Sequence, residues 1–163
     1  MLAIGPDRQS SAGAEHLLRE ALEANGQRFT EQRSSVYRYL LSTESHPTAD
    51  DVFTAVRSEI PDISLATVYK SLETLVGCGL AVKLTYGDGS ARYDGRTDPH
   101  PHARCLDCGA VIDVPGRLDG AALAGLGPLP GFAVESYRLE LVGHCDDCAC
   151  RQGEDQELSR EAP

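Results

Sequence analysis

The sequence predicts an α+β fold made of two small domains. Helical spacing of apolar residues fills the N-terminal half, a β-hairpin pattern follows, and strand patterns with two C-x-x-C pairs fill the C-terminal half. The chain has 163 residues, which is room for one domain or two small ones. Its 41% apolar and 25% charged residues are ordinary for a globular protein and exclude wholesale disorder.

Three helices are predicted in the first part of the chain. Apolar residues recur on one face of residues 13–25, and an Asn-Gly pair ends that helix. Thr30 can cap a second helix that runs through Leu41. Thr48, with Asp51 three residues later, resembles a capping box and opens a short third helix.

The fourth helix is predicted to begin after Ser64 and to have one polar face. Its inward positions are Val68, Leu72 and Leu75. Its outward positions are Thr67, Lys70, Ser71 and Thr74. Two strand patterns follow over 80–86 and 90–94, joined by a Gly-Asp-Gly turn. Helices followed by a hairpin are the layout of a winged helix-turn-helix, in which the last helix reads DNA.

The remaining chain predicts a small C-terminal α/β domain. We expect the first domain over residues 1–95, with 1–12 as a flexible extension, and the second over 96–150. The second has strand patterns around 102–106, 110–114 and 133–142 and a weak helix near 117–126. Residues 151–163 are polar and without periodicity, which predicts a disordered acidic tail.

Charge and hydropathy limit the partners and the compartment. The formal net charge of -10 excludes a uniformly basic nucleic-acid-binding surface but not a local basic patch. No apolar run approaches the roughly 18–20 residues that span a bilayer, so no membrane partner is expected. The N-terminus lacks the basic flank and apolar core of a secretory signal. We therefore expect a cytoplasmic protein.

Four of the six cysteines have the spacing of a metal site. They form two C-x-x-C pairs, Cys105 with Cys108 and Cys145 with Cys148. Two such turns supply four thiolates, which suit a tetrahedral Zn²⁺ with no position open for substrate, and so a structural zinc. In a reducing compartment disulfides are not expected. Cys78 is expected in the core and Cys150 as a bystander.

A second group offers nitrogen and oxygen donors. His100 and His102 lie on an extended segment, where alternation sends both imidazoles to the same side. With Asp94, Asp113 and His46 they form a mixed set that suits Fe²⁺ or Mn²⁺ better than Zn²⁺. Spacing alone singles out only the His-x-His pair. His46 also fits a helix-capping or surface residue, and the two aspartates also fit solvated strand ends.

Several segments in the right order resemble the ferric uptake regulator family. They are RFTEQR at 28–33, HPTAD at 46–50, SLATVY at 64–69 and HPHARCLDCG at 100–109. The resemblance covers roughly residues 14–150. Within it, LTYGD at 84–88 and RYD at 92–94 resemble the peroxide-stress regulator (PerR) branch.

The resemblance implies a homodimeric, metal-dependent repressor that is not an enzyme and binds double-stranded operator DNA. It places a structural Zn²⁺ on the four paired cysteines. It places a regulatory Fe²⁺ or Mn²⁺ on His46, Asp94, His100, His102 and Asp113, and iron-catalysed oxidation on His46 and His100. Tyr137 stands where some members have a His ligand of a further metal site, so that site is not expected.

Candidate DNA contacts lie in the helical half. They are Arg28, Arg33, Thr67, Tyr69 and Lys70, with Arg38 and Arg92 in addition. Each arginine fits a solvated surface charge equally well. Three other functions stay open at this point: a thiol oxidoreductase that uses one C-x-x-C pair, a zinc-ribbon adaptor or metal buffer, and a manganese- or iron-uptake regulator of the same family without peroxide sensing.

Overall fold

The computed structural model has the predicted α+β fold. It describes residues 11–86, 89–116, 127, 129–134 and 139–148. The chain divides into a helical unit, Met1–Asp98, and a sheet unit, Pro99–Pro163. The predicted extension up to residue 10, the Gly-Asp of the hairpin turn, the helix near 117–126, Tyr137, Cys150 and the tail lie outside the described residues. Among the helices that are described, none has the length and apolar character needed to cross a membrane.

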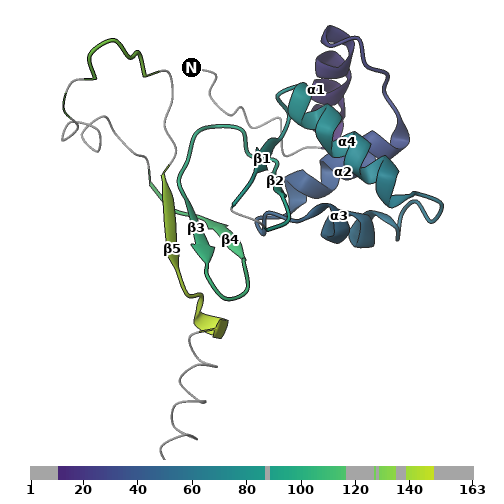
Figure 1. Cartoon of the computed structure of the whole chain (residues 1–163). Helices are drawn as coiled ribbons and strands as arrows, with labels where there is room; N and C mark the ends of the chain where they lie inside the picture. The colour runs from purple at the N-terminus through teal and green to yellow at the C-terminus, as the bar shows by residue number, and fades with distance from the viewer. Residues whose placement is uncertain (1–10, 87–88, 117–126, 128, 135–138, 149–163) are drawn as a thin grey trace, which may run out of the picture. The chain divides into compact units, whose positions relative to one another are not determined.

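Four helices build the described part of the first unit (Figure 1). They are α1 (Ser11–Ala24), α2 (Glu31–Ser42), α3 (Ala49–Val56) and α4 (Leu65–Gly77). The predicted caps are present, because Thr30, Thr48 and Ser64 each accept a hydrogen bond from the backbone N–H three residues later. The Thr48 backbone N–H in turn donates to the Asp51 carboxylate, which completes the capping box. Local sequence therefore sets the start of α2, α3 and α4.

Helix α4 packs against α2 and α3 through its predicted inner face. Val68, Leu72 and Leu75 are fully buried there. Ser71 was predicted to face outward, and that prediction is wrong, since its side chain is buried. Its hydroxyl donates to the Thr67 carbonyl over 2.8 Å. The buried hydroxyl therefore has a hydrogen-bond acceptor within its own helix.

A two-stranded hairpin follows α4 as the wing. Strand β1 (Val82–Leu84) pairs antiparallel with β2 (Arg92–Asp94), with Val82 opposite Asp94. Both strands are shorter than predicted. Leu80 and Ala81 are buried in the helical core before β1 begins. Their apolar side chains therefore reflect packing against the helices, not strand pairing.

Gly95, directly after β2, lies against the end of α2. A Cβ at this position would meet the Leu40 carbonyl oxygen at 2.7 Å, and backbone atoms cannot move aside as a side chain can. We expect Gly95→Ala to lower the free energy of unfolding by about 1–3 kcal/mol, measured by urea denaturation. Gly77→Ala is the control, since its Cβ would meet nothing within 4 Å. Equal losses in both variants would contradict this account.

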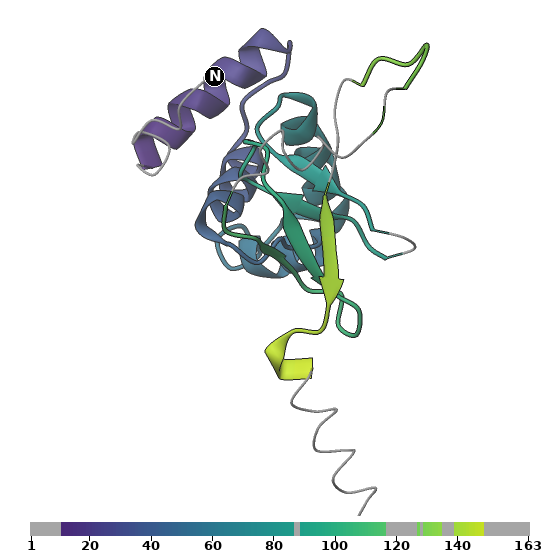
Figure 2. The same ribbon diagram turned by 90° about the vertical axis from the view of Figure 1, so that its left-hand side faces the viewer.

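The described residues of the sheet unit form three strands in the order β4-β3-β5 (Figures 1 and 2). Strand β3 (His102–Cys105) pairs antiparallel with β4 (Val111–Asp113) and parallel with β5 (Glu140–Gly143). The strand predicted over 133–142 is shorter, because residues 133–134 are not in a strand and 135–138 lie outside the described residues. Ile112, Leu141 and Val142 expose large apolar side chains on this sheet.

Candidate metal centres

The two C-x-x-C turns meet at one edge of the sheet. Because β3 and β5 run parallel with Cys105 opposite Gly143, both strands end at that edge. The Leu106 N–H donates to the Gly143 carbonyl over 2.8 Å and so connects the segments that leave β3 and β5. Each turn then follows its own strand end, so parallel pairing explains how cysteines about 40 positions apart in the sequence come together.

The four sulfurs fit one zinc ion. Atoms of Cys105, Cys108, Cys145 and Cys148 all lie within 4.8 Å of one another. The Cys108 and Cys145 Sγ atoms are 3.7 Å apart, and a tetrahedral zinc with bonds of about 2.3 Å separates its sulfurs by about 3.8 Å. None of the described cysteines forms a disulfide. The chain therefore has a four-cysteine site whose donors and spacing suit structural zinc.

Backbone groups favour the thiolate at Cys105. The N–H groups of Cys108 and Cys145 point at its sulfur and lower the pKa of the Cys105 thiol to about 6. The Cys145 nitrogen lies 3.4 Å from that sulfur. Gly109 has a φ of 68°, and its N–H donates to the Cys105 carbonyl over 3.1 Å, which closes the first turn. The thiolate is the form that binds metal.

A histidine that the sequence analysis missed joins the two turns. His144 Nδ1 lies 2.7 Å from Asp107 Oδ2, so one contact connects the residue before Cys145 to the loop between Cys105 and Cys108. Contacts of this kind around a metal site orient its ligands. Its only sequence signal is the position next to Cys145, which does not distinguish it from an ordinary surface histidine.

In the helical unit, His46 and Asp94 lie side by side. His46 Nε2 is 3.7 Å from Asp94 Oδ2, and both side chains are buried. His46 has a φ of 48°, a left-handed conformation that costs a non-glycine residue about 1–3 kcal/mol. The Arg92 guanidinium donates to the His46 carbonyl over 3.0 Å and holds this loop on β2. Such strain, held in place by neighbours, is typical of functional sites.

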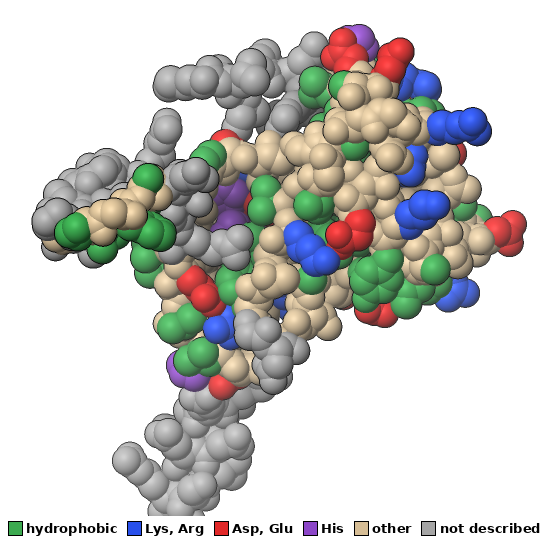
Figure 3. Space-filling model, turned by 45° about the horizontal axis from the view of Figure 1, so that its top comes forward, with side chains coloured by type: hydrophobic (Ala, Val, Ile, Leu, Met, Phe, Trp, Pro, Cys, Tyr) green, Lys and Arg blue, Asp and Glu red, His purple; other side chains and the backbone are tan. Residues whose placement is uncertain are grey.

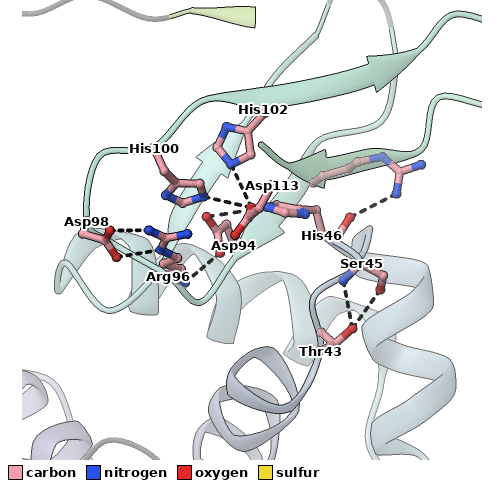
Figure 4. A network of polar contacts seen from close by, with 10 residues as sticks. Thr43, Ser45, His46, Asp94, Arg96, Asp98, His100, His102 and Asp113 are labelled. Carbon is pink, nitrogen blue, oxygen red and sulfur yellow. Dashed lines mark hydrogen bonds and ion pairs between the residues drawn. The ribbon is translucent and has the colours of Figure 1, made fainter. Parts of the chain in front are cut away.

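In the sheet unit, three predicted ligands come together. His102 on β3 is directly opposite Asp113 on β4, so their side chains share one face. His100 Nε2 is 2.9 Å from Asp113 Oδ1, and His102 Nε2 is 3.6 Å from the same oxygen (Figure 4). The two imidazole ring centres are 4.4 Å apart. The alternation predicted for the His-x-His pair thus places both rings beside one carboxylate.

The nitrogen and oxygen donors are chemically separate from the thiolates. The helical unit contributes one imidazole and one carboxylate, and the sheet unit contributes two imidazoles and one carboxylate. Imidazole and carboxylate suit Fe²⁺ and Mn²⁺, and two aspartates balance the charge of one divalent cation. These residues therefore fit the His/Asp metal site that the sequence predicted.

The predicted DNA-contacting residues do not share one environment. Tyr69 and Lys70 are exposed on α4. A hollow of about 460 Å³ runs between α4 and the loop before α2, and Arg28, Arg33, Thr67 and Lys70 line it. On the face shown in Figure 3, basic side chains are dispersed among acidic ones rather than gathered in a dense patch.

Three arginines make contacts within the protein. Arg33 is buried, and its guanidinium donates to the Arg28 carbonyl and, over 3.3 Å, to Thr74 on α4. Arg38 pairs with Glu59 over 3.0 Å. Arg92 holds the His46 loop. The structure thus places these guanidinium groups against protein acceptors, whereas the sequence could not distinguish them from Arg28.

Known proteins are similar to this chain in sequence. The peroxide operon regulator of Bacillus subtilis (strain 168) is 41% identical over 144 residues, covering 85% of this chain and 98% of that protein. The peroxide-responsive repressor PerR of Staphylococcus aureus (strain USA300) is 38% identical over 139 residues, covering 82% and 93%.

Solved structures agree with the fold. The Helicobacter pylori ferric uptake regulator matches with a TM-score of 0.71 at 19% identity, covering 89% of this chain and 97% of that one. The Campylobacter jejuni peroxide stress regulator matches with a TM-score of 0.54 at 27% identity, covering 83% and 98%. The family model described as "Ferric uptake regulator family" matches residues 24–142. The chain is therefore a member of the ferric uptake regulator family, a metal-dependent transcriptional regulator similar to PerR and not an enzyme.

Proposed function

We propose that this protein is a cytoplasmic, peroxide-responsive repressor that binds operator DNA as a homodimer. The observation that carries the proposal is the separation of its donors. Four thiolates gather at one end of the sheet, while each unit separately holds imidazole and carboxylate groups side by side with no sulfur among them. The first set suits a permanent structural zinc, and the second suits an exchangeable Fe²⁺ or Mn²⁺ that acts as co-repressor.

One regulatory metal would be held by His46 and Asp94 of the helical unit together with His100, His102 and Asp113 of the sheet unit. The similarity to a peroxide operon regulator and to a peroxide-responsive repressor supports this assignment, as does the pairing of donors within each unit. Metal that binds donors from both units favours the arrangement in which all five converge. It stimulates DNA binding to the extent that it binds that arrangement more tightly.

DNA contact is assigned to the exposed side of α4 and the loop before α2. Tyr69 and Lys70 are exposed there, Thr67 lies at the start of α4, and Arg28 lines the neighbouring hollow. Arg33 would act indirectly, because its bonds to the Arg28 carbonyl and Thr74 fix that loop against α4. In a dimer, two reading helices would enter successive major grooves about 34–36 Å apart.

The sheet unit is assigned to dimerisation. Ile112, Leu141 and Val142 expose apolar side chains on the three short strands that the described residues form. Exposed apolar area of this kind marks protein interfaces. A second copy of the chain would cover it, as the family's homodimeric character implies.

Histidine oxidation would release the repressor. An Fe²⁺ ion held by these residues would catalyse the reaction, and the imidazole itself would supply the two electrons that reduce hydrogen peroxide. The imidazole Cε1 of His46 or His100 gains one peroxide oxygen and becomes 2-oxo-histidine, and the other oxygen leaves as water. The modified ring is a poorer ligand, so the five donors no longer hold the metal and repression ends. Zinc holds the four thiolates, so they are not needed as sensors.

Mass spectrometry with operator binding tests this mechanism. Protein loaded with Fe²⁺ and treated briefly with low-dose peroxide should gain one oxygen on the His46 or His100 peptide and lose operator binding. The Mn²⁺-loaded protein is the control and should show neither change. Oxidation confined to the four zinc cysteines, with zinc release, would indicate a thiol switch instead. No oxidation, with intact metal-dependent binding, would indicate an uptake regulator that senses metal alone.

A further inference from the structure

We infer that Tyr93 is a positioning residue that connects the regulatory ligands of the helical unit to the reading helix α4. The inference rests on the proposed function and concerns only contacts within the helical unit. It starts from strand β2. All three of its residues contact the loop that carries His46, and Tyr93 contacts α4 as well.

The first half of the connection runs from β2 to the ligand loop. The Tyr93 N–H donates to the Pro47 carbonyl over 2.9 Å, and Thr48 forms a bridge with Arg92. The Arg92 guanidinium adds its bond to the His46 carbonyl. The loop that carries His46 and the strand that carries Asp94 therefore form one hydrogen-bonded piece. A change in the separation of the two ligands has to move the backbone of Tyr93 as well.

The second half runs from β2 to α4. The Tyr93 ring is buried in the helical core, 1% exposed, so it cannot swing independently of its backbone. Its hydroxyl donates to Glu73 Oε1 over 3.1 Å, and Glu73 lies on α4 three positions after Lys70. Lys83 Nζ reaches the same oxygen over 2.6 Å. The hydroxyl of this fixed ring thus transmits the position of β2 to the helix turn that follows the proposed DNA contacts.

This arrangement predicts a specific consequence of metal binding. A metal held between His46 and Asp94 fixes the distance between them and thereby the position of β2. Through Tyr93, it also fixes the position and rotation of α4. Removing the Tyr93 hydroxyl breaks the connection between the metal ligands and α4 and leaves the ligands in place. It leaves Glu73, whose side chain is 51% exposed, still paired with Lys83, so no buried charge is left without a partner.

Tyr93→Phe tests the inference in the full-length protein. We expect Mn²⁺ affinity and zinc content to stay at wild-type values, while the ratio of operator affinities with and without Mn²⁺ falls by about threefold to thirtyfold. Lys83→Gln is the matched control, because it removes the other donor to Glu73 Oε1 but does not touch the ligand loop. It should keep the wild-type ratio. Glu73→Ala removes the acceptor from the exposed side and should lower the ratio as Tyr93→Phe does.

Amide hydrogen exchange gives a readout that needs no DNA. In the wild type, Mn²⁺ should slow exchange along α4, and in Tyr93→Phe this slowing should be lost although Mn²⁺ still binds. If Tyr93→Phe keeps the wild-type ratio and the wild-type protection of α4, the inference is wrong. It is also wrong if both operator affinities fall equally, which would indicate a merely structural role. If Mn²⁺ does not stimulate DNA binding by the wild type, the proposed function fails first.

Discussion

Cys105→Ser is expected to abolish zinc binding, to lower the melting temperature sharply and to dissociate the dimer. In the described part of the sheet unit, the buried apolar side chains besides Cys105 and Cys148 are those of Pro101 and Val111, which make a small core. The binding energy of a structural zinc, about 10–16 kcal/mol in small zinc domains, then acts directly as folding energy. Because the exposed apolar side chains of that sheet are the proposed dimer surface, unfolding the unit removes the dimer too.

Metal analysis, thermal unfolding and size-exclusion chromatography with light scattering measure the three effects. Cys78→Ser is the matched control, since this cysteine packs against the helical core and is not one of the clustered sulfurs. It should keep zinc and the dimer, as should Cys150→Ser. A Cys105→Ser protein that remains dimeric with a wild-type melting temperature would overturn the structural role of the zinc site.

The sequence predicted most of what local chemistry decides. Caps at Thr30, Thr48 and Ser64 fixed helix starts, and the apolar spacing of α4 fixed its inner face. The burial of Ser71 was not predicted. Its hydroxyl donates to the carbonyl one helical turn earlier, so the side chain can be buried with its hydrogen bond satisfied. Hydropathy patterns treat serine as polar and do not register that local bond.

Contacts between residues far apart in the chain could not be predicted from the sequence. The four-cysteine group was predictable because two C-x-x-C turns are a strong signal, but the parallel pairing of β3 and β5 that unites them was not. His144 had no pattern around it, and its partner Asp107 is 37 positions away. Arg33 and Arg92 were counted with possible DNA contacts, since no sequence pattern shows that a guanidinium reaches a carbonyl of the same chain.

Asp94→Ala and His102→Ala should each abolish metal-stimulated operator binding while zinc content and the dimer stay intact. One variant removes a donor from the helical unit and the other from the sheet unit, and neither residue belongs to the thiolate group. Metal coupling between sites is typically about 5–150-fold. We therefore expect each variant with Mn²⁺ to bind operator no better than the metal-free wild type, measured by fluorescence anisotropy at constant salt.

Two surface variants control for the loss of a charge or a ring. Asp98→Ala removes a carboxylate that pairs with Arg96 over 2.7 Å, and His16→Ala removes an imidazole beside Glu20 on α1. Both should keep the full Mn²⁺ effect. If metal-free and metal-loaded wild type bind operator equally, the co-repressor role is wrong. If His102→Ala loses the effect but Asp94→Ala keeps it, the metal binds the sheet unit alone. Only a loss in both variants supports a metal that acts by joining donors from the two units.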